Sequence, residues 1–157
     1  MEIYETTDAD FEKLTKFMEL VDSEFYPPLS SRPGGIKGRI SGTLLRGETN
    51  YLIAEVEGKV AGVIGYRKNW SGTQEAYISF IAVHPEYRRI GIARSLDTAL
   101  MQKLSIDGIS HVNITTWFTN PDVCKMYRQM GYHIFRILKN DRGAGVDTIY
   151  FKKAIEC

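Results

Sequence analysis

Apolar residues recur along the chain with helical and with strand periods, and these periods predict its elements. We expect a short first strand from Glu2 to Thr6. Thr7 and Asp10 then have the spacing of a capping box, which marks a helix start. The apolar residues that follow share one helical face and predict a helix to about Phe25; they are Phe11, Leu14, Phe17, Met18 and Val21.

The middle of the chain changes from an irregular to a strand-like pattern. Three prolines and several glycines between residues 27 and 47 interrupt helix and strand, so we expect a loop with a short helix near Lys37 to Leu45. Two β-rich runs around Glu57 and Gly58 predict a hairpin. The run from Glu75 to Val83 is apolar on both faces, which is typical of a central strand.

Helices and strands alternate after this run. Apolar spacing predicts a helix from about Gly91 to Gly108, and a β-branched run predicts a strand from His111 to Trp117. Asn120 can serve as the N-cap of the next helix, with Pro121 at its first position and Gly131 at its end.

Two further strands, residues 132–138 and 146–154, are predicted at the end, joined by a turn from Asn140 to Gly143. Adjacent strands with interspersed helices predict an α+β protein with a mixed sheet, not a doubly wound one. A length of 157 residues fits one domain, residues 1–157.

Composition and charge exclude several classes of partner. Twenty Lys and Arg against nineteen Asp and Glu give a net charge of +1, so no global field attracts nucleic acid or an acidic membrane. The longest apolar run is too short for a membrane span, and the acidic N-terminus is unlike a signal peptide. We therefore expect no nucleic-acid partner and no membrane partner.

The two cysteines, Cys124 and Cys157, are far apart and support neither a disulfide framework nor a zinc site. His111 and His133 have no cysteine or carboxylate neighbours at ligand spacing, so we expect no metal. This cysteine usage fits a reducing compartment, and we expect a cytoplasmic protein.

The stretch from His84 to Leu96 joins a predicted strand to a predicted helix and has the features of an anion site. The first N–H groups of a helix are unpaired, and the helix dipole adds positive charge there, so a phosphate is the expected guest. Gly91 and Ala93 let a ligand approach the backbone, and three arginines can add charge-assisted hydrogen bonds: Arg88, Arg89 and Arg94. Neither the P-loop pattern nor the dinucleotide pattern occurs, which excludes those two kinds of nucleotide site.

Two motifs resemble those of one known family. Residues 88–93, RRIGIA, are similar to the Arg/Gln-x-x-Gly-x-Gly/Ala signature of the GCN5-related N-acetyltransferase (GNAT) family. The preceding FIAVHPEY resembles the strand and turn of that family, and residues 120–132, NPDVCKMYRQMGY, resemble its later helix. Strong matching covers Glu75 to Tyr132. The resemblance implies a mostly antiparallel mixed sheet of about six to seven strands, flanked by about four helices.

The resemblance implies that the ligand is an acyl-coenzyme A, and that acetyl-coenzyme A is the donor co-substrate. Its pyrophosphate would lie on the turn and helix start, and its pantetheine arm in a wedge where the strand ending at Val83 splays from the next strand. Asn120 would contact the pantetheine. The implied contact residues are Ile81, Ala82, Val83, Arg88, Arg89, Ile90, Gly91, Ile92, Ala93, Arg94, Ser95, Asn120 and Tyr127.

Acetyl transfer to a primary amine makes three chemical demands. The amine must lose its proton, since a lysine-type amine has a pKa of about 10.4. The thioester oxygen becomes an oxyanion, which the backbone N–H of Ile81 or Val83 could bind. The leaving thiolate needs a proton, and Tyr127 matches the position of this acid in many family members. Tyr127 also shares a helical face with Val123 and Met130, where an aromatic residue usually packs in the core.

The sequence leaves the general base open. By count, Tyr77 stands where several family members have a glutamate. Glu75 and Ser79 share the strand face of Tyr77, so Glu75 acting through water is one candidate, and a solvated strand-end carboxylate is the alternative. His84 lies in the turn that faces the phosphates, and we expect a structural role for it.

The acceptor implied by the resemblance is a small-molecule or peptide amine. The family places acceptor specificity in the first helical region and in loops facing the thioester, which gives these candidates: Tyr26, Arg32, Trp70, Trp117 and Phe118. The sequence does not identify the acceptor or the oligomeric state, and a homodimer is compatible with it.

Two other functions remain open. The missing mid-strand glutamate motivates a non-catalytic acyl-coenzyme A-binding sensor or interaction module. The GxxG of residues 35–38 lies beside basic residues and resembles the tetrapeptide with which KH domains clamp RNA between two helices. Here Pro33 and the balanced charge favour a flexible loop instead.

Overall fold

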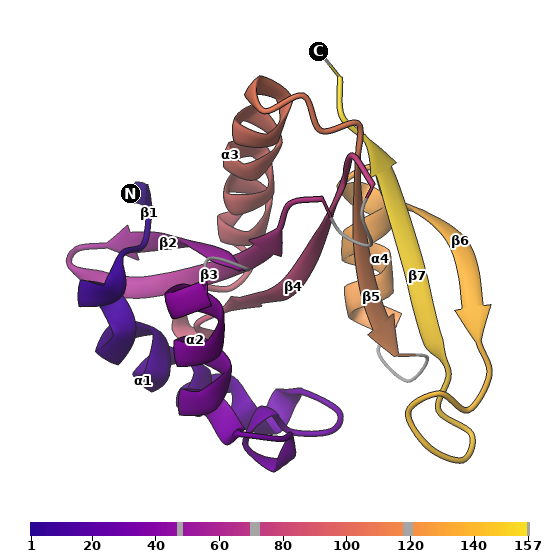
Figure 1. The fold of residues 1–157 in the computed structure, drawn as a ribbon, viewed down its shortest axis with the longest axis horizontal. Coiled ribbons are helices and arrows are strands. Elements are labelled where there is room, and N and C mark those ends of the chain that lie inside the picture. Colours follow the sequence, from indigo (N-terminus) through magenta and orange to yellow (C-terminus); the bar gives the residue numbers. More distant parts are fainter. Residues whose placement is uncertain (47–48, 70–72, 118–120, 157) are drawn as a thin grey trace. The chain divides into compact units, whose positions relative to one another are not determined.

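The computed structural model describes residues 1–46, 49–69, 73–117 and 121–156. These residues form seven strands and four α-helices (Figure 1). The strands are β1 (Glu2–Glu5), β2 (Asn50–Val56), β3 (Lys59–Arg67), β4 (Glu75–Val83), β5 (His111–Trp117), β6 (His133–Leu138) and β7 (Thr148–Ala154). The helices are α1 (Phe11–Val21), α2 (Gly35–Arg46), α3 (Ile92–Ile106) and α4 (Pro121–Gln129).

The strands form a mostly antiparallel sheet with the hydrogen-bonded order β1-β2-β3-β4-β5-β7-β6. β4 and β5 are parallel, and α3 supplies the crossover that a parallel pair needs. This mixed sheet confirms the predicted α+β class. The chain divides into two compact units, which comprise Met1–Arg67 with Ser79–Leu100 and Lys68–Ile78 with Met101–Cys157, so β4 and α3 contribute to both.

The first unit is built on the antiparallel strands β1, β2 and β3. The predicted hairpin is confirmed, because Glu57 and Gly58 join β2 to β3 with φ values of 52° and 78°. Two left-handed residues in succession are what the common two-residue hairpin turn requires. Buried residues of α1, α2 and the strands pack into one core, which includes Leu14, Met18, Ile40, Ile53, Val63 and Phe80.

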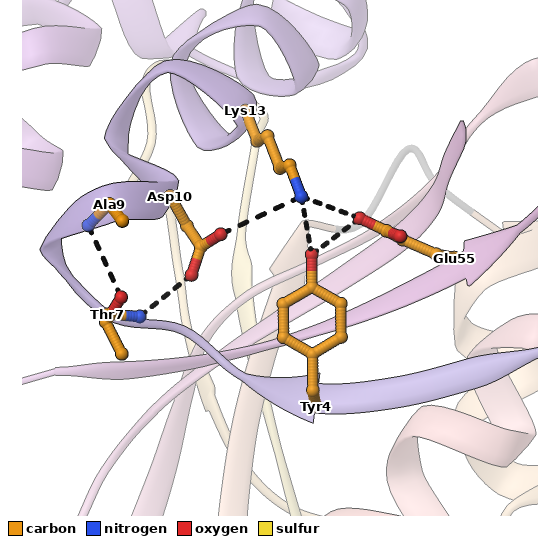
Figure 2. Close-up of polar contacts among 6 residues, drawn as sticks. All are labelled: Tyr4, Thr7, Ala9, Asp10, Lys13 and Glu55. Atoms are coloured by element: carbon orange, nitrogen blue, oxygen red, sulfur yellow. Dashed lines mark hydrogen bonds and ion pairs between the residues drawn. The ribbon is translucent and has the colours of Figure 1, made fainter. Parts of the chain in front are cut away.

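The start of α1 is tied to the neighbouring strands by polar contacts (Figure 2). Thr7 and Asp10 form the predicted capping box. The Thr7 hydroxyl accepts the backbone N–H of Ala9 at 3.3 Å, and the backbone N–H of Thr7 donates to Asp10 Oδ2 at 2.9 Å. Glu55 Oε1 accepts the Tyr4 hydroxyl at 2.6 Å and Lys13 Nζ at 3.0 Å. These two hydrogen bonds lower the pKa of Glu55, and the cluster anchors the helix to β1 and β2.

The first helix ends earlier than predicted. α1 stops at Val21 and is followed by a 3-10 turn, Asp22–Glu24, where the sequence indicated one helix to about Phe25. Phe25 is extended, with φ −98° and ψ 149°. Pro27 and Pro28 follow two and three residues later, and helices usually end at or before the residue that precedes a proline.

The second helix begins earlier than predicted. α2 starts at Gly35 instead of near Lys37, after Gly34 turns the chain with a φ of 82°. The GxxG of residues 35–38 is therefore the first turn of this helix, and the expectation of a flexible loop there was wrong. It also does not join two helices in the manner of a KH domain.

The second unit is built on β5, β7 and β6, which are antiparallel neighbours (Figure 1). The start of β4 adds a parallel register, from Glu75 opposite His111 to Ile78 opposite Ile114. α4 begins at Pro121 and closes before Gly131, whose φ is 94°, as predicted. Among the described residues, no helix combines the length and apolar character that crossing a membrane requires.

The start of α3 packs closely on β3 at a glycine. A Cβ at Gly62 would lie 2.7 Å from Ile92 Cγ2 and 3.1 Å from Leu96 Cδ1. Val63, the next residue, belongs to the core beneath α1 and α2, so Gly62 faces the opposite side of the strand. The missing side chain thus sets how near the sheet α3 begins.

We expect Gly62→Ala to destabilise the fold by about 1–3 kcal/mol, because overpacking forces the helix away from the strand. Gly38→Ala is the matched control, since a Cβ there meets nothing within 4 Å. It should leave stability unchanged or raise it by up to about 1 kcal/mol. Urea unfolding measures both variants, and an equal loss in the two would contradict the role of Gly62.

Candidate active site

The chain leaves β4 through a turn whose backbone is held by hydrogen bonds. His84 begins a 3-10 turn, Pro85–Tyr87. Its N–H donates to Ala61 O at 2.8 Å, and its Nδ1 accepts the N–H of Glu86 at 3.1 Å. His84 thus has the structural role expected from the sequence.

The turn then enters α3 with two left-handed residues, Arg89 at a φ of 65° and Gly91 at 88°. A non-glycine residue at positive φ is uncommon, and such strained positions cluster at ligand sites. The backbone N–H of Ser95 in the first turn of α3 donates a hydrogen bond to Gly91 O at 2.9 Å. Arg89, Gly91 and Arg94 are exposed, so this end of the helix faces outward.

Arg88, the first residue of the signature, is held by oxygens of the chain itself. Its Nη2 donates to both carboxylate oxygens of Glu24, at 2.6 and 2.7 Å, and its Nε donates to Val83 O at 3.1 Å. Sequence reasoning missed Glu24 because it lies 64 residues away and belongs to no motif. Arg88, which was predicted to bind a phosphate, therefore already has an anionic partner within the chain.

The end of β4 carries the predicted pantetheine-binding backbone, residues 81–83, in the same unit. Ser79 and Val83 have backbone groups on one edge of this strand, with those of Ile81 between them. Arginine side chains take the two outer carbonyls: Arg39 Nη2 donates to Ser79 O at 2.7 Å, and Arg88 Nε donates to Val83 O. At this edge of β4, arginine side chains therefore bind carbonyls that a neighbouring strand usually binds in a sheet.

In the second unit, Tyr127 is buried, with 4% of its surface exposed. Its ring lies edge-on to Phe151, with centroids 5.4 Å apart, and 6.1 Å from Tyr132. Core packing therefore accounts for the ring, and only the hydroxyl remains for chemistry. Cys124 on the same helix is a buried, unpaired thiol whose pKa is raised by that burial.

Glu75 is bound by two side chains and is not a simply solvated carboxylate. It accepts Asn113 Nδ2 at 3.0 Å and pairs with Lys152 Nζ at 2.9 Å. These contacts, Asn113 first, lower the pKa of Glu75, which keeps it ionised and makes it a weaker base. Asn113 is fully buried, and a polar amide inside an apolar strand was the one sequence signal that could have pointed to it.

The two predicted catalytic residues lie on opposite faces of β7. Lys152 and Phe151 are successive residues of that strand, so their side chains point to opposite sides. Glu75 pairs with Lys152, whereas Tyr127 packs on Phe151. No pattern in the sequence indicated this separation.

Tyr77, at the position of the absent glutamate, makes a hydroxyl contact of 2.9 Å with Thr115 Oγ1. Trp117, an acceptor candidate on the same strand as Thr115, lies under Arg142, whose guanidinium carbon is 5.4 Å from the ring centre. Arg142 Nε donates to Thr148 Oγ1 at 3.1 Å. The loop between β6 and β7 therefore reaches the half-buried Trp117.

The first unit holds two other acceptor candidates. Tyr26 is 45% exposed, and Arg32 donates to Pro27 O through Nε and Nη2, at 3.2 and 3.0 Å.

Within the described ranges, no group of three or more His, Cys, Asp or Glu side chains is placed to hold a metal ion. Trp70, Phe118 and Asn120 lie outside the described residues.

Sequence comparison connects these features to known proteins. A family model described as the acetyltransferase (GNAT) family matches residues 14–132. An acetyltransferase of Sodalis glossinidius is 34% identical over 84 residues, which are 54% of this chain and 57% of that protein. The matched segment therefore spans little more than half the length of this curated relative.

Two solved structures share the fold over nearly the whole chain. An aminoglycoside 6′-N-acetyltransferase complexed with coenzyme A has a TM-score of 0.80 at 16% identity, covering 100% of this chain and 98% of that one. The ribosomal-protein-S18-alanine N-acetyltransferase of Escherichia coli has a TM-score of 0.79 at 19% identity, covering 99% and 94%. At these identities the likeness shows the fold.

We expect Glu75→Gln to lower stability by about 1 kcal/mol at neutral pH, because it removes the charged partner of Asn113 and Lys152. The pKa of Glu75 is lowered by folding. Its contribution is therefore present above the unfolded-state pKa of about 4.3 and is lost as the pH falls through the lower folded value.

Urea unfolding of the two proteins, at neutral pH and below about pH 4, measures this difference. Glu156→Gln near the end of the chain makes the same charge change and is the control. A difference that is independent of pH, or an equal loss in the control, would contradict the interaction.

Proposed function

The chain belongs to the acetyltransferase (GNAT) family, and we propose that it transfers an acetyl group from acetyl-coenzyme A to a primary amine. The observation that carries this proposal is the turn before α3, with left-handed Arg89 and Gly91 and an outward-facing helix start. A pyrophosphate suits this end of the helix because the first N–H groups and the dipole both favour negative charge. The coenzyme A complex of a protein with the same fold supports this donor.

The donor would be held mainly by backbone. We assign its pyrophosphate to the N–H groups of residues 89–95 and to the Arg88 guanidinium, and its pantetheine arm to the edge of β4 at residues 81–83. The arginine contacts at Ser79 and Val83 support this assignment. They show that groups other than a strand bind this edge of β4, and we infer that a ligand can do so as well. Asn120 is assigned to the pantetheine.

The proposed reaction is a direct attack in a ternary complex. The neutral amine forms an N–C bond with the thioester carbon, and the C–S bond breaks as the tetrahedral intermediate collapses. The N–H of Ile81 or Val83 stabilises the oxyanion, and Tyr127 gives its phenolic proton to the departing sulfur. The proton of the attacking amine leaves through water toward Glu75.

Tyr127 and Glu75 have their contacts on opposite faces of β7, so the proposed reaction gives them separate protons and uses water on the path to Glu75. The lowered pKa of Glu75 means that it accepts a proton only briefly, and water must carry the proton onward.

A non-catalytic acyl-coenzyme A-binding sensor is the second candidate. One observation favours it: Asn113 and Lys152 engage Glu75 and weaken it as a base, and Tyr77 occupies the position where a glutamate is often found. Such a module would bind the coenzyme and release no thiol with any amine.

We further propose that both units act as one domain over residues 1–157. The match to the family model over residues 14–132 crosses both units and supports this. The proposed acceptor is an amine on a small molecule or a peptide; the names of the two solved structures give an aminoglycoside and an alanine of a ribosomal protein as acceptors of those proteins. No metal enters this mechanism, and a cytoplasmic location and a possible homodimer stay predictions.

We expect Tyr127→Phe to lower kcat for acetyl transfer by about 100-fold, because general acid catalysis contributes at least that much. Affinity for coenzyme A should stay within about twofold, since the ring is retained. Thiol release with a panel of amines measures kcat, and calorimetry with coenzyme A measures affinity.

Tyr132→Phe is the matched control, because it removes the hydroxyl of the neighbouring buried tyrosine. It should keep most of the activity. Full activity in Tyr127→Phe would refute the acid role, and coenzyme binding without turnover by the unmodified protein would favour the sensor.

A further inference from the structure

The signature arginine is bound to an anion of its own chain. Arg88 Nη2 contacts both Glu24 carboxylate oxygens, at 2.6 and 2.7 Å, while its Nε is held by Val83 O at 3.1 Å. A carboxylate offers a guanidinium the same kind of charged oxygens as a phosphate does. Glu24 therefore occupies part of the surface that the donor phosphates would use.

Glu24 is placed there by anchored neighbours. Asp22, two residues earlier, accepts the Ser30 N–H at 2.8 Å and its hydroxyl at 2.6 Å. Phe25, the next residue, stacks on Phe80 of β4, with ring centroids 5.2 Å apart and planes 16° apart. The backbone is thus fixed on both sides of Glu24, and the contact with Arg88 is not a chance meeting of two long side chains.

The pair can be displaced at low cost. The side chains of Arg88 and Glu24 are 43% and 41% exposed, and ion pairs this open to water contribute little to stability. A pyrophosphate brings more negative charge than one carboxylate, so it can take Arg88 from Glu24. The phosphates and the Glu24 carboxylate therefore compete for the same guanidinium N–H groups.

We propose that Glu24 competes with the phosphates of coenzyme A for Arg88 and thereby sets the affinity of the donor site. This inference rests on the proposed function, because it assumes that the turn binds the donor. The product, coenzyme A, carries the same phosphates as the donor, so the competition also favours product release.

Calorimetry with coenzyme A tests this as a double-mutant cycle of Glu24→Gln and Arg88→Gln. Glu24→Gln should bind coenzyme A about threefold more tightly than the unmodified protein, a gain within what an exposed ion pair contributes. In the Arg88→Gln background the same substitution should leave Kd unchanged. Glu12→Gln removes the same charge from an exposed position of α1 and should also leave Kd unchanged.

Unchanged or weaker binding by Glu24→Gln would overturn the inference. Equal tightening in the Arg88→Gln background or in Glu12→Gln would do the same, because it would reveal a general charge effect. No binding by any variant would refute the proposed function and the inference together, whereas binding with no coupling in the cycle would refute the inference alone. Thermal unfolding of each variant shows that it is folded.

Discussion

The close approach of α3 to β3 is the constraint from which the geometry of the proposed donor site follows. Gly62 leaves room for Ile92 and Leu96 against the strand, so the helix begins close to the sheet. The chain must then reverse between Val83 and Ile92, which it does with a 3-10 turn and two left-handed residues. That reversal points the helix start outward, where its unpaired N–H groups can meet an anion.

The second half of β4 depends on side chains as much as on strands. Phe80 lies in the core between the rings of Phe17 and Phe25, and arginines bind the carbonyls of Ser79 and Val83. The first half of the same strand pairs with β5 and carries Glu75. One strand thus holds the backbone proposed to bind the donor at one end and the candidate base at the other, and the two ends belong to different units.

Periodicity predicted nearly every element, because helix and strand spacing are local properties of the chain. It misplaced the end of α1, where Phe25 is extended before the prolines, and the start of α2 after Gly34. The motifs located the turn and Tyr127, but no local pattern could pair Glu24 with Arg88 across 64 residues. The contacts of Glu75 escaped prediction for the same reason, since Asn113 and Lys152 become its neighbours only when the strands align.

A carboxylate whose pKa is lowered removes protons poorly, so the acceptor's own ionisation governs the rate of the proposed reaction. A lysine-type amine with a pKa of about 10.4 is neutral in roughly one molecule of 2,500 at pH 7, whereas an α-amino group with a pKa of about 7.7–8.0 is neutral in roughly one of six to one of eleven. With the same site, the second kind of amine presents a far larger reactive fraction. In the proposed reaction, the contacts of Asn113 and Lys152 that hold Glu75 ionised therefore favour acceptors of low pKa and leave proton removal mainly to water.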